Sequence, residues 1–250
     1  MSALAGAAFA ASSLDLLAYS PPGWGANLLR GLVNSVLIAL GAFGVGLAIG
    51  TAGAYGKLYG SPVVKDLLAI YTTLVRAVPE LVLILILYFG VTDAVNRLLI
   101  SLGHEAIQIN GIVAGILVLG VVQGAYATEV LRGAILAVPA GQIEAARAMG
   151  MPAGMLARRI TLPSMLSFAL PGLANLWLVA TKDTALLAVV GFAELTQETR
   201  QAAGTTKAYF TFFMAAGGLY LALSLTSTFV FSRIEKRARR GLRSASGAGR

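Results

Sequence analysis

Residues 138–163 read VPAGQIEAARAMGMPAGMLARRITLP and lie between two long apolar segments of the chain. Residues 144–149 favour a helix, and Gly150 is suited to end it, because glycine adopts the left-handed conformation of a helix C-cap without steric cost. Pro152 is typical of the first turn of a second helix, and Pro163 is expected to close that helix. The stretch therefore predicts two short helices joined by a tight turn.

The apolar residues around this loop fall into blocks long enough to cross a bilayer, which takes about 20 helical residues. Hydrophobic residues make up 57% of the 250-residue chain and charged residues only 12%, against about 25% charged residues in soluble domains. This composition excludes a disordered protein and disfavours a soluble enzyme. We expect an all-α polytopic membrane protein with five transmembrane helices, over residues 32–54, 67–91, 109–131, 167–192 and 209–231.

Basic residues predict the orientation, since Lys and Arg gather on the cytoplasmic side. Residues 233–250 hold seven Lys or Arg and one Glu, so this basic tail is expected in the cytoplasm. Five spans then place the N-terminus outside and the loops 55–66 and 136–166 inside. The net charge of +8 reflects this asymmetry and not a nucleic-acid partner. Residues 1–31 are expected to form an N-terminal interfacial segment, and residues 32–232 the transmembrane domain.

The chain offers few groups for catalysis. It has no cysteine and a single histidine, His104, which we expect to be solvated in an outer loop. The nearest approach to a phosphate-binding loop is residues 53–57. It fails because Thr51 stands where a glycine is required and Leu58 replaces the Ser or Thr that would bind magnesium. We therefore expect no catalytic residue, no metal site and no nucleotide site in this chain.

The spacing of Glu144-Ala-Ala, Gly150 and Ile160-Thr-Leu-Pro163 resembles the EAA loop of ABC importer permeases. The resemblance runs from residue 28 to residue 236. Within the family, the chain is similar to the polar amino acid branch, and it looks most like the membrane subunits of histidine, lysine/arginine/ornithine and opine importers. The stretches that carry this likeness are YTTLVRAVPE at 71–80, GAYATEVLRG at 124–133, LPGLANLW at 170–177 and KDTALL at 182–187.

The resemblance implies the type I ABC importer permease fold, with a cytoplasmic coupling loop at about 138–163. It implies a bacterial inner-membrane transport subunit, surrounded by lipid, that is not itself an enzyme. The implied partners are an ABC ATPase dimer that binds ATP and magnesium, a homologous second permease, a periplasmic solute-binding protein and an amino acid substrate. The residues implied to dock on the ATPase are Glu144, Ala145, Ala146, Gly150, Ile160, Leu162 and Pro163.

Ionisable residues within a span are costly and usually mark a transport path or an ion pair. Arg76 and Glu80 are four residues apart, so one continuous helix would put them on one face, and Pro79 between them can kink that helix. Two interpretations stay open: an internal ion pair, or a face that lines the path. Near the cytoplasmic end of the third span, Glu129 and Arg132 are expected to form a structural pair.

The candidates for a substrate site are Thr72, Arg76, Glu80, Tyr126 and Asp183. We expect Arg76 to hold the α-carboxylate of the substrate and Glu80 its cationic side chain. The predicted cargo is therefore histidine, arginine, lysine, ornithine or a related opine. Asp183 and the adjacent Lys182 should point in different directions and need separate partners.

Two other functions compete with an importer subunit. A stand-alone secondary amino acid transporter often shows internal inverted repeats, whereas five spans cannot form two equal halves. A membrane-embedded enzyme would need a nucleophile with a base, or a metal cluster, and the sequence shows no such constellation.

Overall fold

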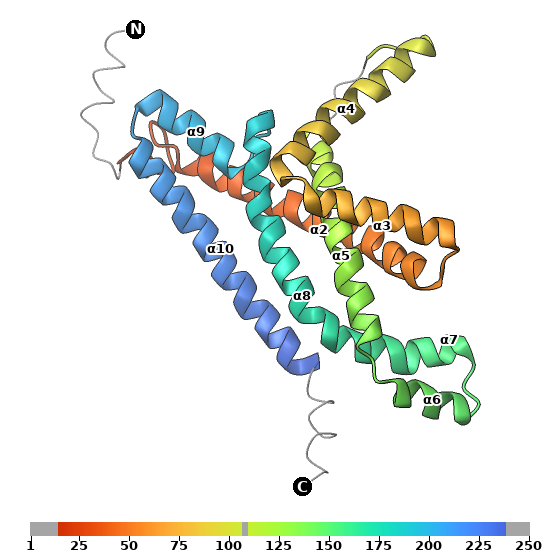
Figure 1. Ribbon diagram of the computed structural model, residues 1–250. Coiled ribbons are helices and arrows are strands. Elements are labelled where there is room, and N and C mark those ends of the chain that lie inside the picture. Colours follow the sequence, from red (N-terminus) through yellow and green to blue (C-terminus); the bar gives the residue numbers. More distant parts are fainter. Residues whose placement is uncertain (1–14, 107–109, 239–250) are drawn as a thin grey trace. The chain divides into compact units, whose positions relative to one another are not determined.

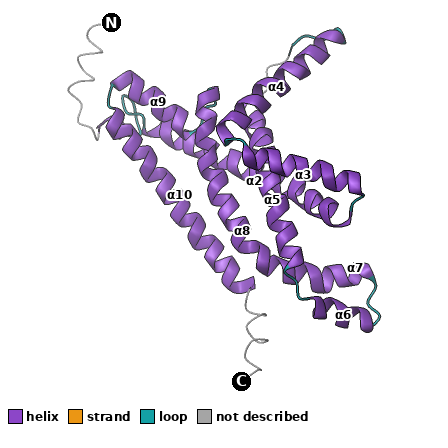
Figure 2. Ribbon diagram, viewed as in Figure 1, coloured by secondary structure: helices purple, strands orange, loops and turns teal. Residues whose placement is uncertain are grey.

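The computed structural model describes residues 15–106 and 110–238, and every regular element in those ranges is a helix (Figures 1 and 2). The expectations for residues 1–14, for the start of the third span at 109 and for the tail beyond 238 fall outside the described residues. The elements, in chain order, are η1 (Asp15–Leu17), α2 (Gly25–Tyr59), α3 (Pro62–Ala77), α4 (Glu80–Ser101), α5 (Gly111–Leu136), α6 (Ala140–Ala148), α7 (Ala153–Leu156), η2 (Ala157–Thr161), α8 (Leu162–Asp183), η3 (Thr184–Val190), α9 (Leu195–Thr206) and α10 (Tyr209–Ala238).

Five helices of the described part are long and apolar enough to cross a membrane. They are Gly25–Tyr59, Glu80–Ser101, Gly111–Leu136, Ala153–Val190 and Tyr209–Ala238. The predicted number of spans and the all-α class are confirmed. The first span is longer at both ends than expected. The bounds of the second and fourth spans differ most from those expected, and in both cases a proline is involved.

The second span does not run from 67 to 91. Helix α3 ends at Ala77, Val78 is extended with φ −98° and ψ 139°, and α4 begins at Glu80. The ring of Pro79 disfavours the α conformation at the residue before it, so the chain leaves the helix at Val78. The candidate span is therefore Glu80–Ser101, and α3 is a separate helix.

The expected helix stop at Pro163 is also wrong, because α7, η2, α8 and η3 follow one another without a gap. The amide of Leu162 bonds to the carbonyl of Ala157, five residues earlier, so η2 is one turn of π-helix. Proline lacks an amide hydrogen and crowds the carbonyl four residues before it. The wider π-turn gives Pro163 room, and the helix continues through it.

The described residues divide into two compact units. The first contains the residues up to Ala42, Glu80–Leu119 and Ala180–Leu225, and the second contains Phe43–Pro79, Gly120–Val179 and the residues from Thr226. Each unit has apolar cores of its own, and small residues let its helices approach closely.

In the first unit, one core gathers around Ile38, Leu119 and Leu187, and another around Leu28, Leu195 and Phe212. In the second unit, the core is formed by α2, α5 and α8, with Ala54, Leu131 and Ala169 among its buried members. On α2, a Cβ atom at Gly50 would lie 2.4 Å from the Cβ of Ala127 on α5, so this contact requires glycine.

Candidate functional site

The predicted helix–turn–helix at 138–163 is present, and its turn has the geometry expected of Gly150. The amide of Gly150 bonds to the carbonyl of Arg147 at 2.9 Å, and the amide of Met151 bonds to the carbonyl of Ala146 at 3.1 Å. These two bonds form a Schellman motif. Gly150 has φ +73°, a conformation that glycine adopts without a Cβ clash.

Most residues of this hairpin are exposed. Of the predicted coupling residues, Ala146 is buried and Ile160 is half-buried, whereas Glu144, Ala145, Gly150, Leu162 and Pro163 are exposed. Met149 keeps 79% of its surface exposed. Exposed methionine beside charged residues is typical of protein-docking surfaces, because the thioether side chain adapts to its partner.

A hollow of about 400 Å³ lies in the hairpin, and we call it the coupling hollow. Its lining includes Ala145, Met149, Met151, Arg159 and Ile160. The hydroxyl of Ser164 donates a hydrogen bond to Oε1 of Gln142 at 3.3 Å, which ties α6 to the start of α8. The hairpin therefore presents an indented face rather than a flat one.

Arg76 and Glu80 belong to different helices. Arg76 is exposed in the last turn of α3, whereas Glu80 is half-buried in the first turn of α4. The expectation that they share one face of a continuous helix is wrong, because Val78 and Pro79 interrupt the helix.

Thr72 belongs to a polar cluster in the second unit. Its buried hydroxyl accepts a hydrogen bond of 2.7 Å from Nζ of Lys57. Lys57 also pairs with the carboxylate of Glu129, and Glu129 pairs with Arg132 at 2.9 Å. The structural pair of Glu129 and Arg132 is confirmed.

Sequence reasoning missed Lys57, which it placed in a loop outside the first span. Helix α2 continues to Tyr59, so Lys57 is helical and only 13% of its side chain is exposed. The length of the apolar run carried no sign of this extension. A lysine within hydrogen-bonding reach of a carboxylate can be found only once α2 and α5 are placed together.

The remaining candidates are Tyr126 and Asp183. Tyr126 is half-buried on α5 and packs against the core of the second unit. Asp183 is buried at the end of α8, whereas Lys182 beside it is exposed, as expected for adjacent helical residues. The second unit thus contains Thr72, Arg76 and Tyr126, and the first unit contains Glu80 and Asp183.

Glu194 is a second residue whose role sequence reasoning missed. It is completely buried and caps α9, where its carboxylate accepts hydrogen bonds from the amides of Thr196 and Gln197 at 2.8 and 2.7 Å. It also accepts from the hydroxyls of Ser35 at 3.3 Å and Tyr220 at 3.0 Å. Burial raises the pKa of Glu194, and the four donors oppose that rise.

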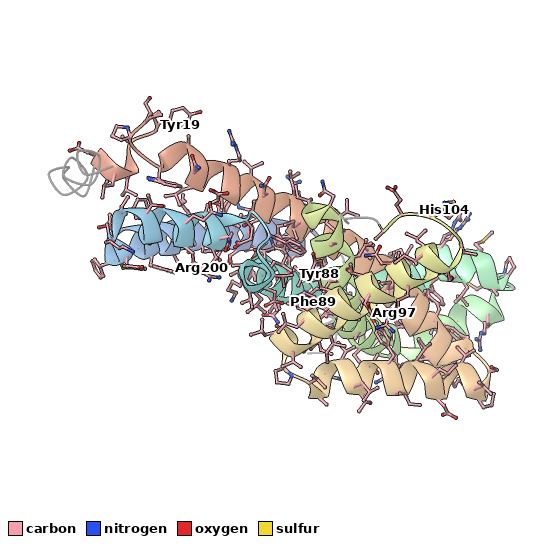
Figure 3. The ribbon with its side chains drawn as sticks, turned by 90° about the horizontal axis from the view of Figure 1, so that it is seen from above. Tyr19, Tyr88, Phe89, Arg97, His104 and Arg200 are labelled. Atoms are coloured by element: carbon pink, nitrogen blue, oxygen red, sulfur yellow. The ribbon has the colours of Figure 1, made fainter. Side chains whose placement is uncertain are left out.

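Figure 3 labels Tyr88, His104 and Arg200 of the first unit. Tyr88 on α4 packs edge-on against Phe192, with ring centroids 5.1 Å apart. Arg200 on α9 donates a hydrogen bond of 3.1 Å to the carbonyl of Ala188. His104 is exposed beyond the end of α4, as expected, and the described residues contain no group of His, Cys, Asp and Glu that could hold a metal ion.

Comparison with known families decides what this helical protein is. Residues 42–240 match the family described as the binding-protein-dependent transport system inner membrane component. The chain belongs to this family. It is an inner-membrane permease, the transport component of an ABC system whose other parts are an ATPase and a binding protein.

Individual relatives cover nearly the whole permease. The nopaline transport system permease protein NocQ of Agrobacterium fabrum is 42% identical over 233 residues, which is 92% of this chain and 99% of the relative. The histidine/lysine/arginine/ornithine transport system permease protein HisQ of Escherichia coli is 38% identical over 223 residues, 89% of this chain and 98% of the relative.

A solved structure agrees with these relatives. A chain in the crystal structure of an amino acid ABC transporter with histidines is 29% identical in sequence to this permease. The two structures align with a TM-score of 0.75, over 91% of this permease and 99% of that chain. Membership decides against the two competing functions. A permease of this family is one component of a larger system, whereas a secondary transporter or a membrane enzyme would act alone.

Proposed function

We propose that this permease imports cationic amino acids or opines, driven by ATP that a partner hydrolyses. The observation that carries the proposal is the set of relatives named for histidine, lysine, arginine, ornithine and nopaline, which match 89–92% of the chain at 38–42% identity. ATP and magnesium then bind the ATPase dimer, and this chain binds no cofactor. The remaining partners are a homologous second permease and a periplasmic solute-binding protein.

The proposed substrate contacts are Glu80 and Arg76. Glu80 is half-buried at the start of α4, and a carboxylate attracts a cation more strongly in such a position than in water. The guanidinium of Arg76 has the planar fork that pairs with a carboxylate in two parallel bonds. Thr72, Tyr126 and Asp183 complete the proposed set.

The proposed coupling contact is the hairpin of α6 and α7. Its exposed residues and the coupling hollow offer a partner both projecting side chains and a cavity. The Schellman turn supports this role because it is rigid. A movement of the ATPase would then displace α8, whereas a flexible loop would absorb the movement. We also propose that the hairpin and the C-terminus face the cytoplasm and that the N-terminus lies outside, as the basic residues indicate.

Reconstitution tests the function. The permease, its second permease and the ATPase would be placed in proteoliposomes with ATP inside and the solute-binding protein outside. Uptake of labelled histidine, arginine, lysine, ornithine and nopaline would be compared with uptake of glutamate and leucine. We expect ATP-dependent uptake of at least one cationic amino acid or opine. Uptake of only glutamate or leucine would overturn the substrate assignment, and uptake without ATPase would overturn the mechanism.

A further inference from the structure

An apolar groove of about 180 Å³ lies in the second unit, and of the residues expected to dock on the ATPase only Leu162 belongs to its lining. Helices α2, α5 and α8 form its walls, with Thr51, Tyr55, Leu131, Leu162 and Leu166 among the lining residues. Leu162 and Leu166 keep 45% and 42% of their surfaces exposed. The groove is therefore open on the side that these two leucines share.

Helix geometry puts a positive charge one turn before Leu162. Leu162 and Leu166 are four residues apart on α8 and share a face. Arg158 precedes Leu162 by four residues, within the π-turn whose bond joins Leu162 to Ala157. Arg158 therefore lies one turn beyond the groove on the same side of the helix.

Two further observations indicate that the guanidinium of Arg158 is accessible to a ligand. Arg158 is exposed, and it forms no ion pair with an acidic side chain within residues 15–106 and 110–238. The neighbouring Arg159 faces another way, since it lines the coupling hollow with Ile160. The sequence thus offers two adjacent arginines at different surfaces.

Aromatic residues mark the same end of the groove on α2. Tyr55 lines the groove, and its ring lies 5.8 Å from the ring of Tyr59, one turn later. Tyrosine prefers the level of lipid headgroups, where its ring is apolar and its hydroxyl is hydrated. Tyr55 and Tyr59 on α2 and Arg158 before α8 therefore suit the end of the apolar groove to a lipid headgroup.

We propose that this groove is a binding site for an anionic phospholipid, with an acyl chain along Leu162 and Leu166 and the phosphate on Arg158. Apolar walls suit a hydrocarbon chain, and the guanidinium fork matches two phosphate oxygens. Basic pockets beside apolar surfaces between transmembrane helices bind anionic headgroups in this way. A helix of a protein partner would fill the apolar part but would have to bring an acid to Arg158.

Photo-crosslinking tests the site. The purified permease complex would be reconstituted with a trace of phosphatidylglycerol that carries a photoreactive acyl chain, and labelled peptides would be mapped by mass spectrometry. The same experiment with phosphatidylcholine is the headgroup control. We expect phosphatidylglycerol to label the segments that contain Tyr55 and Leu166 preferentially, and an excess of unlabelled phosphatidylglycerol to compete.

Matched variants separate charge from packing. Arg158→Gln should weaken labelling about fivefold, the equivalent of about 1 kcal/mol for one basic residue at a membrane surface. Arg158→Lys should retain most of the labelling, and Arg159→Gln should leave it unchanged. Thr51→Trp, which fills the groove, should abolish labelling by both lipids at these segments while the complex still assembles.

Three results would overturn the proposal. They are equal labelling by phosphatidylcholine and phosphatidylglycerol, an Arg158→Gln variant that labels like the wild type, and a loss in Arg159→Gln as large as that in Arg158→Gln. A fourth is a Leu166→Cys variant that crosslinks to the second permease and not to lipid, because it would assign the groove to a subunit interface.

Discussion

Lys57 on α2 donates a hydrogen bond to the carboxylate of Glu129 on α5, which lies 72 residues later in the chain. The same carboxylate accepts two bonds from the guanidinium of Arg132, at 3.1 and 2.9 Å. The side chains of Lys57 and Glu129 are only 13% and 19% exposed. If α2 and α5 moved apart, each charge would lose its partner in a place where water solvates it poorly. The pair therefore holds α2 to α5 in the second unit.

Lys57→Met should destabilise the purified complex by about 1–3 kcal/mol, because it leaves the partly buried carboxylate with one cation in place of two. The matched control is Arg97→Met. The pair of Arg97 and Asp93 is 79% and 61% exposed, and such surface pairs contribute about 0.2–1 kcal/mol. Thermal unfolding in detergent compares the two variants. If Lys57→Met and Arg97→Met had equal melting temperatures, Lys57 would not stabilise the fold more than an exposed surface pair does.

Gly150→Val should insert into the membrane normally but lose transport and substrate-stimulated ATP hydrolysis. A Cβ atom at Gly150 would meet nothing within 4 Å, so the effect comes from the backbone. The left-handed conformation costs a residue with a side chain about 1–2 kcal/mol, and the Schellman turn should shift to avoid it. ATP-driven uptake in proteoliposomes measures the loss.

Two controls accompany the Gly150 variant. Gly154→Ala also meets open space, but it lies inside α7 and should transport normally. Gly150→Asn should be milder than Gly150→Val, because asparagine tolerates the left-handed region. Wild-type transport by Gly150→Val would count against a coupling role for the turn.

Glu194→Gln should remove a pH dependence from the stability of the permease. Because burial raises the pKa of Glu194, the folded protein keeps this proton over a range in which the unfolded chain has released it. The stabilisation is complete below the unfolded pKa and is lost as the pH rises through the folded one. Glutamine keeps an acceptor for the amides of Thr196 and Gln197 but cannot titrate.

The measurement for Glu194 is the melting temperature of both proteins across the acidic and neutral range. The difference between wild type and Glu194→Gln should favour the wild type most at low pH and shrink as the pH rises. Glu198→Gln, on the same helix α9, is the control for a general effect of lost charge. Parallel melting curves for wild type and Glu194→Gln would contradict the expected proton uptake.

A reporter fused after residue 250 should show a cytoplasmic C-terminus. The seven basic residues of 233–250 favour that side. Alkaline phosphatase, which folds only outside the cytoplasm, should be inactive there, and a green fluorescent protein should be bright. Active phosphatase would reverse the proposed orientation and place the coupling hairpin outside.

Glu80→Gln should weaken the uptake of a cationic amino acid by on the order of 1–3 kcal/mol, the cost of losing a charge-assisted hydrogen bond. Assembly and basal ATP hydrolysis should not change. Asp93→Asn, an exposed acid on the same helix, is the control for a general loss of negative charge. Equal uptake by wild type and Glu80→Gln would remove Glu80 from the substrate site.

The number of spans, the turn at Gly150 and the pair of Glu129 and Arg132 could all be predicted from the sequence. Each depends on residues that are close in the chain. A span needs only enough consecutive apolar residues, a left-handed C-cap needs only glycine, and residues three apart on a helix are neighbours whatever surrounds them.

Two prolines show where local reasoning stops. Pro79 and Pro163 each lack an amide hydrogen and crowd the preceding turn, yet the helix ends before Pro79 and continues through Pro163. At Pro163 the carbonyl of Ala157 finds a donor in Leu162 through a π-turn, whereas Val78 is extended. The same chemistry has two outcomes, because the contacts made by the rest of the structure decide whether the helix continues past the proline.

The burial of Lys57 and Glu194 was decided by tertiary structure alone. In the sequence Glu194 stands near a second acid, Glu198, with nothing to set it apart. Ser35, which donates to its carboxylate, stands 159 residues earlier. The partner of Lys57 is 72 residues away. A charged side chain becomes a structural centre only when distant segments bring it donors or a counter-charge, and no local pattern of hydrophobicity encodes which segments those are.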